Sequence, residues 1–441
     1  MRNILMIAYY YPPLGGAGVQ RTLKFSKFLS KMGYNISVLT VLNDSNTIKD
    51  DSMTLEVIDG IKVYRAKQGK YISLSSNISK NKESKLYIRH DNLSSDKSVN
   101  IKIKNVIKNI FKKIYANINI PDDKISWRKD AVRLGLEIIH QNSIDIIYST
   151  SGPYTSHLIA YELKRKTNLK WIADFRDQWV SNPFVKYMFI PKEINKYLER
   201  KVIEKSDRVI SVSKPIIDDF INRYEKIDKN KFSVITNGYD EEDFNDYDIN
   251  KKIDKFIITY NGTIYGKRSP KNFLKAVDSL IIDHKIDKKN IIIQFVGQLG
   301  NDGKREIQEF VYKYNDKVEL IEYLPHKQSI KQLERSSALL LIIEGGEGSE
   351  GIYTGKVFEY IRSGRFIIGI VPEGVAKNLI QETNTGMCCS PNSIKEIAEV
   401  INTAYKIWLN EGRPLNINWN EVKKYERENI AKQLSIIIKN L

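Results

Sequence analysis

The sequence has little cysteine and histidine, and this narrows the chemistry available to it. Its 441 residues include two cysteines, Cys388 and Cys389, which are neighbours. Adjacent cysteines rarely bond to each other, so we expect reduced, buried thiols instead of a disulfide framework. The five histidines are scattered, with no HExxH or other paired arrangement. We therefore expect no bound metal and no cofactor.

Long apolar runs are also missing. No run reaches the ~18 residues needed to span a bilayer. The first residues, MRNILMIAYYYPP, contain a short apolar stretch with no small-residue cleavage site after it. We therefore expect a first β-strand there instead of a signal peptide, and a cytoplasmic protein. The length is too great for one ordinary core and suits two domains.

The charge is strongly basic. The formal net charge is +17, which favours anionic partners such as a membrane surface, a nucleic acid or a phosphorylated substrate. Lysine, isoleucine and asparagine are abundant throughout, so part of the excess reflects general composition. No RNA-recognition or helix-turn-helix signature is present, and we expect no nucleic-acid partner.

The most informative stretch of the chain lies between residues 338 and 374. The apolar run Ala338–Ile343 predicts a buried strand, and a loop rich in glycine and glutamate follows it. A helix is expected to begin at Thr354 and Gly355, and to end at Gly364, which suits a left-handed C-cap. The next apolar run, Phe366–Val371, predicts a second strand. This βαβ unit places a helix N-terminus, which favours anions, at the carboxyl edge of a parallel sheet.

Two charged residues occupy the start of this helix. Lys356 offers a cation for phosphate, and Glu359, three residues later on a neighbouring position of the helix face, offers a carboxylate for sugar hydroxyls. A nucleotide ligand needs both groups. Alternatively, Lys356 and Glu359 form a solvated ion pair, and the loop contains glycines only because its turn requires them.

The segment TGKVFEYIRSGRFIIG resembles the donor site of the retaining glycosyltransferases of family 4, in the branch with (T/P)GK-x-FEY-(L/I)-x-x-G-(R/K). The resemblance implies that Glu359 holds the ribose of a nucleotide-sugar, and that Thr354, Gly355 and the loop before them receive the diphosphate. The family has another glutamate eight residues before Glu359. That position is Gly351 here, with Glu350 beside it.

Weaker resemblances follow in the family's order. YPPLGGAGVQR is similar to the glycine loop that faces the donor across the cleft, which assigns donor contacts to Gly15 and Gly16. EYLPHK is similar to the segment that binds the nucleobase, which assigns Leu324 and His326 to the base.

The glycine loop NGTIYGKRSP resembles the second diphosphate loop of the family. Gly262, Thr263 and Lys267 are assigned to donor binding. The family's arginine after the glycine is Thr263 here, and its lysine five residues later is Arg268. The implied leaving-group cations are Arg268, Lys356 and Lys267.

A polar cluster, DFRDQW, ends the strand predicted at 170–173. Surface ion pairing is one interpretation of Asp174, Arg176 and Asp177. In the family this strand end often carries a histidine followed by an aspartate beside the reacting sugar. Alignment places Arg176 at the histidine and Asp177 at the aspartate. We assign Asp177 to catalysis, and His157, Asp174 and Arg176 to the acceptor side.

The segment 68–120 is an insertion relative to the resemblance. Its last part, IKIKNVIKNIFKKIYANINI, has apolar residues at helical spacing with lysines between them. A basic amphipathic helix of this kind can lie on an anionic bilayer. It can equally turn its apolar stripe toward a protein core.

We therefore predict an α/β protein with two Rossmann-like domains facing a cleft, the B-type glycosyltransferase fold. The predicted parts are residues 1–245, residues 250–415 and a C-terminal helix, 416–441, that packs back on the first domain. The acidic run 240–248 is interpreted as a linker, and its Asp-Tyr-Asp at 246–248 as a solvated turn instead of a metal site.

The resemblance implies retaining transfer of a sugar from a nucleotide-diphosphate sugar to a hydroxyl acceptor. We expect a saccharide or lipid-linked acceptor in bacterial surface polysaccharide assembly, with contact at the inner face of the cytoplasmic membrane. A nucleotide-sugar epimerase of the same architecture and a non-catalytic sugar-nucleotide binder remain the alternatives.

Overall fold

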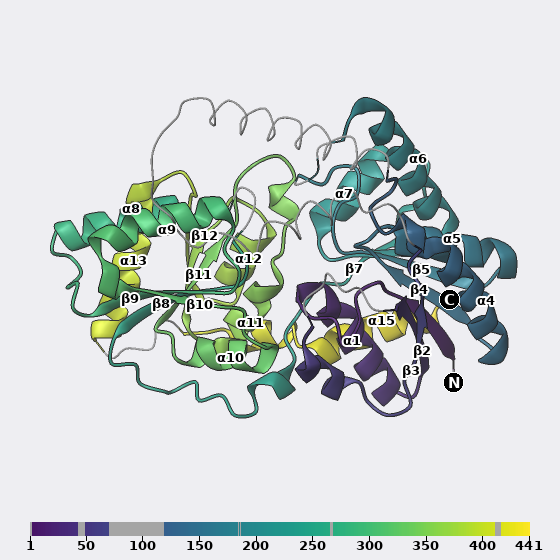
Figure 1. Ribbon diagram of the computed structural model, residues 1–441, viewed down its shortest axis with the longest axis horizontal. Helices are drawn as coiled ribbons and strands as arrows, with labels where there is room; N and C mark the ends of the chain where they lie inside the picture. The colour runs from purple at the N-terminus through teal and green to yellow at the C-terminus, as the bar shows by residue number, and fades with distance from the viewer. Residues whose placement is uncertain are drawn as a thin grey trace, which may run out of the picture.

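The computed structural model describes residues 2–42, 49–69, 119–183, 185, 187–264, 268–410 and 416–441. Two parallel β-sheets lie side by side, each flanked by helices (Figure 1). The prediction of an α/β fold with two such halves is confirmed. Most of the insertion, including the predicted amphipathic helix up to residue 118, lies outside the described residues.

The N-terminal sheet has seven strands in the order β3-β2-β1-β4-β5-β6-β7, and all its neighbouring strands pair in parallel. Its strands are β1 (Asn3–Ile7), β2 (Asn35–Val41), β3 (Lys62–Ala66), β4 (Ile146–Thr150), β5 (Lys170–Phe175), β6 (Arg208–Ser211) and β7 (Phe232–Val234). The helices between them are α1 (Ala17–Lys31), α4 (Arg128–Gln141), α5 (Thr155–Thr167), α6 (Phe189–Lys205) and α7 (Lys214–Arg223).

The C-terminal sheet has six parallel strands in the order β10-β9-β8-β11-β12-β13. Its strands are β8 (Phe256–Asn261), β9 (Ile291–Val296), β10 (Val318–Ile321), β11 (Ala338–Ile342), β12 (Phe366–Ile370) and β13 (Gly386–Cys389). Its helices are α8 (Lys271–Ile282), α9 (Asn301–Lys313), α10 (His326–Glu334), α11 (Gly355–Ser363), α12 (Val375–Glu382) and α13 (Ile394–Leu409).

The strand order reverses beside the first strand of each sheet. β2 and β4 flank β1 in the first sheet, and β9 and β11 flank β8 in the second. Ligands of open parallel sheets bind at such a reversal, at the carboxyl ends of the strands. The loops after β1 and β8 carry the predicted glycines, so the fold brings both glycine loops to the positions where a ligand is expected.

The chain crosses back to the first domain at its C-terminal end. α14 (Trp419–Lys423) is followed by α15 (Arg427–Lys439), which packs beside α1. The Tyr34 hydroxyl lies 2.8 Å from Ser435 Oγ, and Arg2 Nη1 donates to the Ile438 carbonyl at 2.7 Å. Apolar residues of α15 therefore complete the core of the N-terminal domain.

We predicted one continuous helix from Trp419, and the structure differs. The helix breaks between Lys423 and Arg427 because this segment pairs with Tyr239. The Tyr239 N–H donates to the Tyr425 carbonyl at 3.0 Å, and the Arg427 N–H donates to the Tyr239 carbonyl at 2.8 Å. Backbone groups used between segments are not available to continue an α-helix.

The predicted reduced cysteines are confirmed. Cys388 and Cys389 lie on β13 as free thiols, Cys389 buried and Cys388 half-buried. None of the helices in the described segments is long and apolar enough to cross a membrane.

A buried ion pair joins α1 to the centre of the N-terminal sheet. Arg21 Nε and Nη2 donate to the two carboxylate oxygens of Asp174 at 2.7 and 2.9 Å. The guanidinium also donates to the carbonyls of Ile235 and Thr236. Thr150 Oγ1 donates to the same carboxylate at 3.0 Å, and the Tyr148 hydroxyl donates to it as well. One arginine thereby connects α1, β5 and the end of β7.

Removing one partner of this ion pair should destabilise the N-terminal domain. Arg21→Ala leaves the buried Asp174 carboxylate without its counter-charge, and we expect the free energy of unfolding to fall by about 3–5 kcal/mol. Lys214→Ala is the matched control, because its pair with Asp218 is exposed and is worth about 0–1 kcal/mol. Urea unfolding followed by tryptophan fluorescence measures both. Equal losses of unfolding free energy in the two variants would show that the buried Arg21–Asp174 pair does not stabilise the domain.

Candidate nucleotide-sugar site

The predicted loop and helix after β11 are present with the expected bounds. Thr354 occupies the N-cap position of α11, and Gly364 ends the helix in the left-handed conformation with φ 67°. Thr354 Oγ1 is buried and makes no hydrogen bond within the described part of the chain. The helix start therefore presents a hydroxyl and backbone N–H groups that a ligand could use.

Lys356 projects from the first turn of α11 toward the loop after β8. Its ammonium is buried without a hydrogen-bond partner among the described residues, and it lies 3.6 Å from the centre of the Tyr260 ring. Burial and the nearby Arg268 lower the pKa of Lys356 well below its usual value, while Glu359 opposes this shift. A buried lysine with a lowered pKa and no acceptor is suited to an anionic ligand, which would favour its charged form.

Gly262 allows this approach. A Cβ at Gly262 would lie 2.8 Å from Lys356 Nζ, and its φ of 132° is rarely adopted by residues with side chains. Thr263 follows as an exposed residue whose carbonyl accepts from the Tyr260 hydroxyl at 3.2 Å. Arg268 lies close enough to lower the pKa of Lys356 and to counteract a rise in that of Asp177. Lys267 lies outside the described residues.

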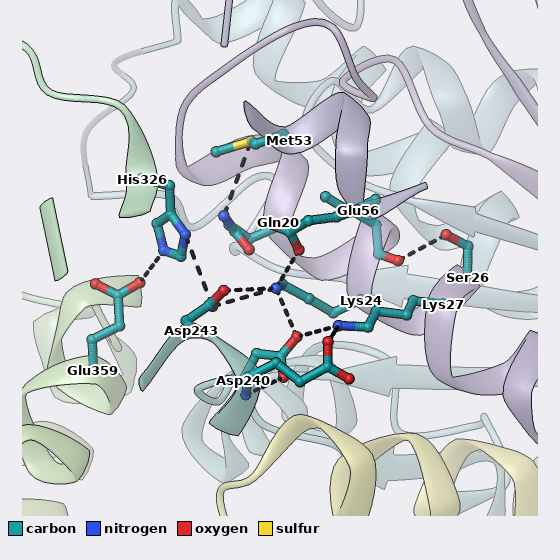
Figure 2. A network of polar contacts seen from close by, with 12 residues as sticks. Gln20, Lys24, Ser26, Lys27, Met53, Glu56, Asp240, Asp243, His326 and Glu359 are labelled. Carbon is teal, nitrogen blue, oxygen red and sulfur yellow. Dashed lines mark hydrogen bonds and ion pairs between the residues drawn. The ribbon is translucent and has the colours of Figure 1, made fainter. Parts of the chain in front are cut away.

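Glu359 lies one turn beyond Lys356 and bonds to His326. His326 Nε2 is 3.0 Å from Glu359 Oε1, and the other carboxylate oxygen has no hydrogen bond in the described segments (Figure 2). On its other side, His326 Nδ1 lies 3.8 Å from Asp243 Oδ2. Burial alone would lower the pKa of His326, but Glu359 and Asp243 outweigh it and raise this pKa to about 9. The ring therefore sits protonated between two carboxylates.

The segment 240–248 was predicted as an acidic linker, and its first residues are bound to α1. Lys24 Nζ contacts Asp240 at 2.7 Å, Asp243 at 3.3 Å and also Glu56 (Figure 2). Lys27 Nζ contacts the same oxygen of Asp240 at 2.9 Å. Burial would raise the pKa of Asp240, but the two lysines outweigh it and lower this pKa to about 2.

Three of these groups, Glu56, Asp243 and His326, are close enough together to hold a metal ion. The Lys24 ammonium already contacts both carboxylates and supplies a positive charge. Their proximity is therefore explained by ion pairing, without a metal.

The first glycine loop faces the nucleobase segment across the two domains. A Cβ at Gly15 would lie 3.0 Å from Asp50 Cβ and 3.1 Å from the Tyr323 hydroxyl. Asp50 Oδ2 accepts hydrogen bonds at 3.2 Å from Tyr323 Oη and from the His326 N–H, the first of α10. At Gly16, φ is 91° and the space beside Cα is open. Leu324, half-buried, lies between Tyr323 and α10.

The side chain of Arg176, assigned to the acceptor side, hydrogen-bonds to the backbone of two neighbouring segments. Its Nη1 donates to the Gly18 carbonyl at 2.6 Å, its Nη2 to the Gly152 carbonyl at 3.1 Å, and its Nε to the Ser151 carbonyl. The Gly18 carbonyl belongs to the first turn of α1, the Ser151 and Gly152 carbonyls belong to the loop after β4, and Arg176 itself follows β5. The arginine donors recorded here are used by protein backbone.

Asp177, the next residue, has an exposed side chain. The surrounding protein still desolvates it enough to raise its pKa, against the opposing effect of Arg176 and Arg268. Arg268 belongs to the other domain, so Asp177 lies near the loop that follows β8.

Asp174 and His157 are closed to solvent. Asp174 is held by Arg21, and His157 Nδ1 lies 2.8 Å from Ser149 Oγ on β4. Both side chains are 0% exposed, and burial lowers the pKa of His157 to about 3. The structure therefore places these two residues in the domain interior, where neither side chain is accessible from solvent.

Gly351 packs against the N-terminal domain. Its carbonyl accepts from Ser213 Oγ at 2.8 Å, and a Cβ there would lie 3.3 Å from Pro215 Cβ. Glu350 beside it is exposed. The loop before α11 therefore touches both domains, since a Cβ at Gly348 would also lie 3.1 Å from Gln178 Oε1.

Sequence reasoning missed the residues that join the domains at this site. Asp50, Lys24 and Asp243 contact groups far away in the chain, and no local pattern marks them. The acidic run was one available signal, because acidic side chains beside a basic helix can pair with it.

Two family models match the sequence. "Glycosyltransferase Family 4" matches residues 104–243, and "Glycosyl transferases group 1" matches residues 241–420. The chain is a glycosyltransferase of the two-domain GT-B type. A search of curated protein sequences finds no match.

Solved structures share this glycosyltransferase's fold over its whole length. Sucrose-phosphate synthase from Thermosynechococcus elongatus has a TM-score of 0.64 at 14% identity, covering 100% of this chain and 99% of that one. Anabaena HepE in complex with UDP-glucose has a TM-score of 0.65 at 11% identity, covering 100% of both chains. The lipopolysaccharide outer core galactosyltransferase WaaB has a TM-score of 0.57 at 14% identity and also covers 100% of both.

The raised pKa of His326 makes stability depend on pH. The folded pKa of about 9 exceeds the unfolded value of ~6.5, so protonated His326 stabilises the fold fully below about pH 6.5 and loses this effect as pH rises through 9. Relative to His326→Gln, the wild-type advantage should be larger at about pH 6 than at about pH 10 by on the order of 2 kcal/mol.

Urea unfolding of both proteins at the two pH values measures this difference. The comparison with His326→Gln removes the contributions of lysines and tyrosines that titrate in the same range. A wild-type advantage that does not change with pH would show that His326 is not held charged.

Proposed function

We propose that the enzyme transfers a sugar, with retention, from a nucleoside diphosphate sugar to a hydroxyl acceptor. The observation that carries the proposal is the buried Lys356 ammonium, which has no hydrogen-bond partner in the described chain and lies at the N-terminus of α11. The solved complexes of HepE with UDP and with UDP-glucose support a nucleotide-sugar donor.

The nucleoside lies, in this proposal, between the glycine loop at Gly15 and α11. Glu359 keeps one oxygen on His326 and offers the other to the ribose hydroxyls, one turn along α11 from Lys356. Leu324 and His326 border the nucleobase. Gly16, which has open space beside its Cα, leaves room for the ligand on the opposite side, and Gly15 allows close packing against Asp50 and Tyr323.

The diphosphate then meets Lys356, Arg268 and the free N–H groups of α11. The bond from the sugar C1 to the diphosphate oxygen breaks, and that oxygen leaves with the electron pair. The acceptor oxygen bonds to C1 on the same face and passes its proton to the departing phosphate. Cations and backbone donors arranged in advance stabilise the growing charge, which is the main catalytic contribution.

Asp177 is proposed to contact the reacting sugar or the acceptor hydroxyl from the N-terminal wall. Arg176 positions it by holding the neighbouring loops together. Asp174 and His157 support this wall from the interior.

The proposed setting is assembly of a bacterial surface polysaccharide. The similarity of the fold to WaaB, a lipopolysaccharide outer core galactosyltransferase, supports this setting. A screen of nucleotide-sugars for thermal stabilisation identifies the donor, because a ligand at about 100 times its Kd adds ~2.7 kcal/mol to stability. Turnover with saccharide and lipid-linked acceptors then tests transfer. Donor binding with no turnover on any acceptor would instead favour a binding protein.

Glu359→Ala should weaken donor binding. A charge-assisted bond to ribose is worth ~1.5–3 kcal/mol, so we expect at least a roughly tenfold rise in the donor Kd. Calorimetry with the donor found in the screen measures it. Glu373→Ala, an exposed carboxylate of the same domain, is the control and should bind like the wild type. Unchanged affinity in Glu359→Ala would show that the ribose lies elsewhere.

Lys356 should take up a proton when the diphosphate binds. The pKa of Lys356 is well below its usual value in the free protein, and two phosphate charges raise it again. At about pH 8, we expect proton uptake when UDP binds the wild type, and a smaller uptake with Lys356→Met. Calorimetry in two buffers of different ionisation enthalpy measures the proton number. Equal uptake in both proteins would remove Lys356 from the diphosphate site.

A further inference from the structure

The first turns of α6 expose a row of large apolar side chains. Met188, Phe189, Ile190, Ile194 and Tyr197 are between 40% and 78% exposed. α6 lies at the outer end of the N-terminal domain, at the top right of Figure 1. We call these five residues the α6 ridge. Contiguous apolar surface of this kind on a folded protein usually marks an interaction site.

The ridge is not needed to pack α6 onto its own domain. The opposite face of the helix is buried through residues such as Pro191, Val202 and Ile203. On that face Asn195 Oδ1 accepts from Trp179 Nε1 at 2.9 Å, and Glu199 Oε2 accepts from the Val180 N–H at 3.0 Å. A surface helix with one packed face normally has polar residues on the other. The ridge is therefore an additional apolar face.

Basic side chains border the ridge. Lys192 and Lys196 are exposed between its members, and Lys201 Nζ lies 5.4 Å from the Tyr197 ring centre. Glu193 is the exposed acid within this stretch, and Arg200 pairs with Glu204 further along. An apolar ridge with lysines beside it fits a surface that is apolar inside and negatively charged outside.

A second copy of the chain fits this ridge less well. Two copies meeting ridge to ridge would bring the lysines of both helices together, and like charges at a contact are unfavourable. An anionic bilayer instead offers phosphates to the lysines and acyl chains to Phe189 and Ile190.

The ridge is also connected to the proposed active site. The loop from Asp177 to Val180 leads directly toward α6, and the buried face of α6 holds that loop through Trp179 and Val180. The Tyr154 hydroxyl donates to the Gln178 carbonyl of the same loop. The helix that carries the ridge is thus packed through its other face on the loop that follows Asp177.

We propose that the α6 ridge is a membrane-docking surface for the anionic leaflet of a bilayer. Phe189 and Ile190 enter the headgroup layer, and Lys192, Lys196 and Lys201 contact lipid phosphates. The proposal deepens the proposed function, because it places a lipid-linked acceptor beside Asp177. It names a different segment from the amphipathic stretch at 101–120.

Flotation of the full-length protein with phosphatidylcholine vesicles, with and without phosphatidylglycerol, tests the proposal. Phe189→Ser/Ile190→Ser and Lys192→Gln/Lys196→Gln should each lower the partition coefficient on anionic vesicles by about tenfold or more. All these side chains are exposed, so melting temperatures should stay unchanged. Donor affinity by calorimetry should also stay unchanged.

Matched controls come from exposed residues elsewhere. Leu55→Ser/Tyr312→Ser removes two large apolar side chains that are each 85% exposed, and Lys395→Gln/Lys406→Gln removes two exposed lysines of α13. Both should bind anionic vesicles like the wild type. If the controls lose binding as much as the α6 variants do, the ridge is not the docking surface.

Other outcomes would overturn the proposal directly. The first is that the wild-type protein does not bind anionic vesicles. The second is that the α6 variants bind them as strongly as the wild type does. The third is that the wild type binds neutral and anionic vesicles equally. A wild-type dimer in sedimentation that the apolar α6 variant dissociates, without vesicle binding, would assign the ridge to a second copy. Vesicle binding without any nucleotide-sugar binding would support the docking surface and contradict the proposed function. Nucleotide-sugar binding without vesicle binding would support the proposed function and contradict the docking surface.

Discussion

The relative position of the two domains at the cleft depends on a buried ammonium group, that of Lys24. The side chain is 1% exposed, and a buried ion without counter-charges costs several kcal/mol. Asp240 and Asp243 supply these charges from the segment that connects β7 to β8, so this segment must lie against α1. Asp243 then lies beside His326 at the start of α10, whose first N–H is capped by Asp50 from the N-terminal domain. The nucleobase segment is thereby brought opposite the first glycine loop.

The opposite wall of the cleft has an unbalanced charge. Lys24, Lys27 and Arg21 are each paired with carboxylates, whereas Lys356 is buried with Arg268 nearby and no hydrogen-bond acceptor in the described chain. Burial disfavours the charged form of Lys356, and an anionic ligand would supply the missing counter-charge. The N-terminus of α11 lies at the same point and also favours an anion.

Local patterns in the sequence were sufficient to predict the fold and the start of α11. The helix bounds followed from Thr354 and Gly364, whose conformational preferences act within a few residues. Contacts between distant segments could not be predicted in this way. Lys24 and Asp243 are more than two hundred residues apart, and Asp50 caps a helix of the other domain. Asp174 was expected beside the acceptor because it ends a strand, but its pairing with Arg21 encloses it. The break before α15 likewise depends on Tyr239, which no helical periodicity reveals.

Two departures from the family's pattern occur where neighbouring segments pack closely. A Cβ at Gly351 would lie 3.3 Å from Pro215 Cβ and 3.4 Å from Ser213 Oγ, so a side chain there would require α7 to shift slightly. The glycine instead lets the loop before α11 accept a hydrogen bond from Ser213. In the N-terminal domain, the guanidinium of Arg176 hydrogen-bonds to the carbonyls of both Gly18 and Gly152. A histidine ring is too short to reach both. At both positions the residue present makes backbone hydrogen bonds that hold neighbouring segments together.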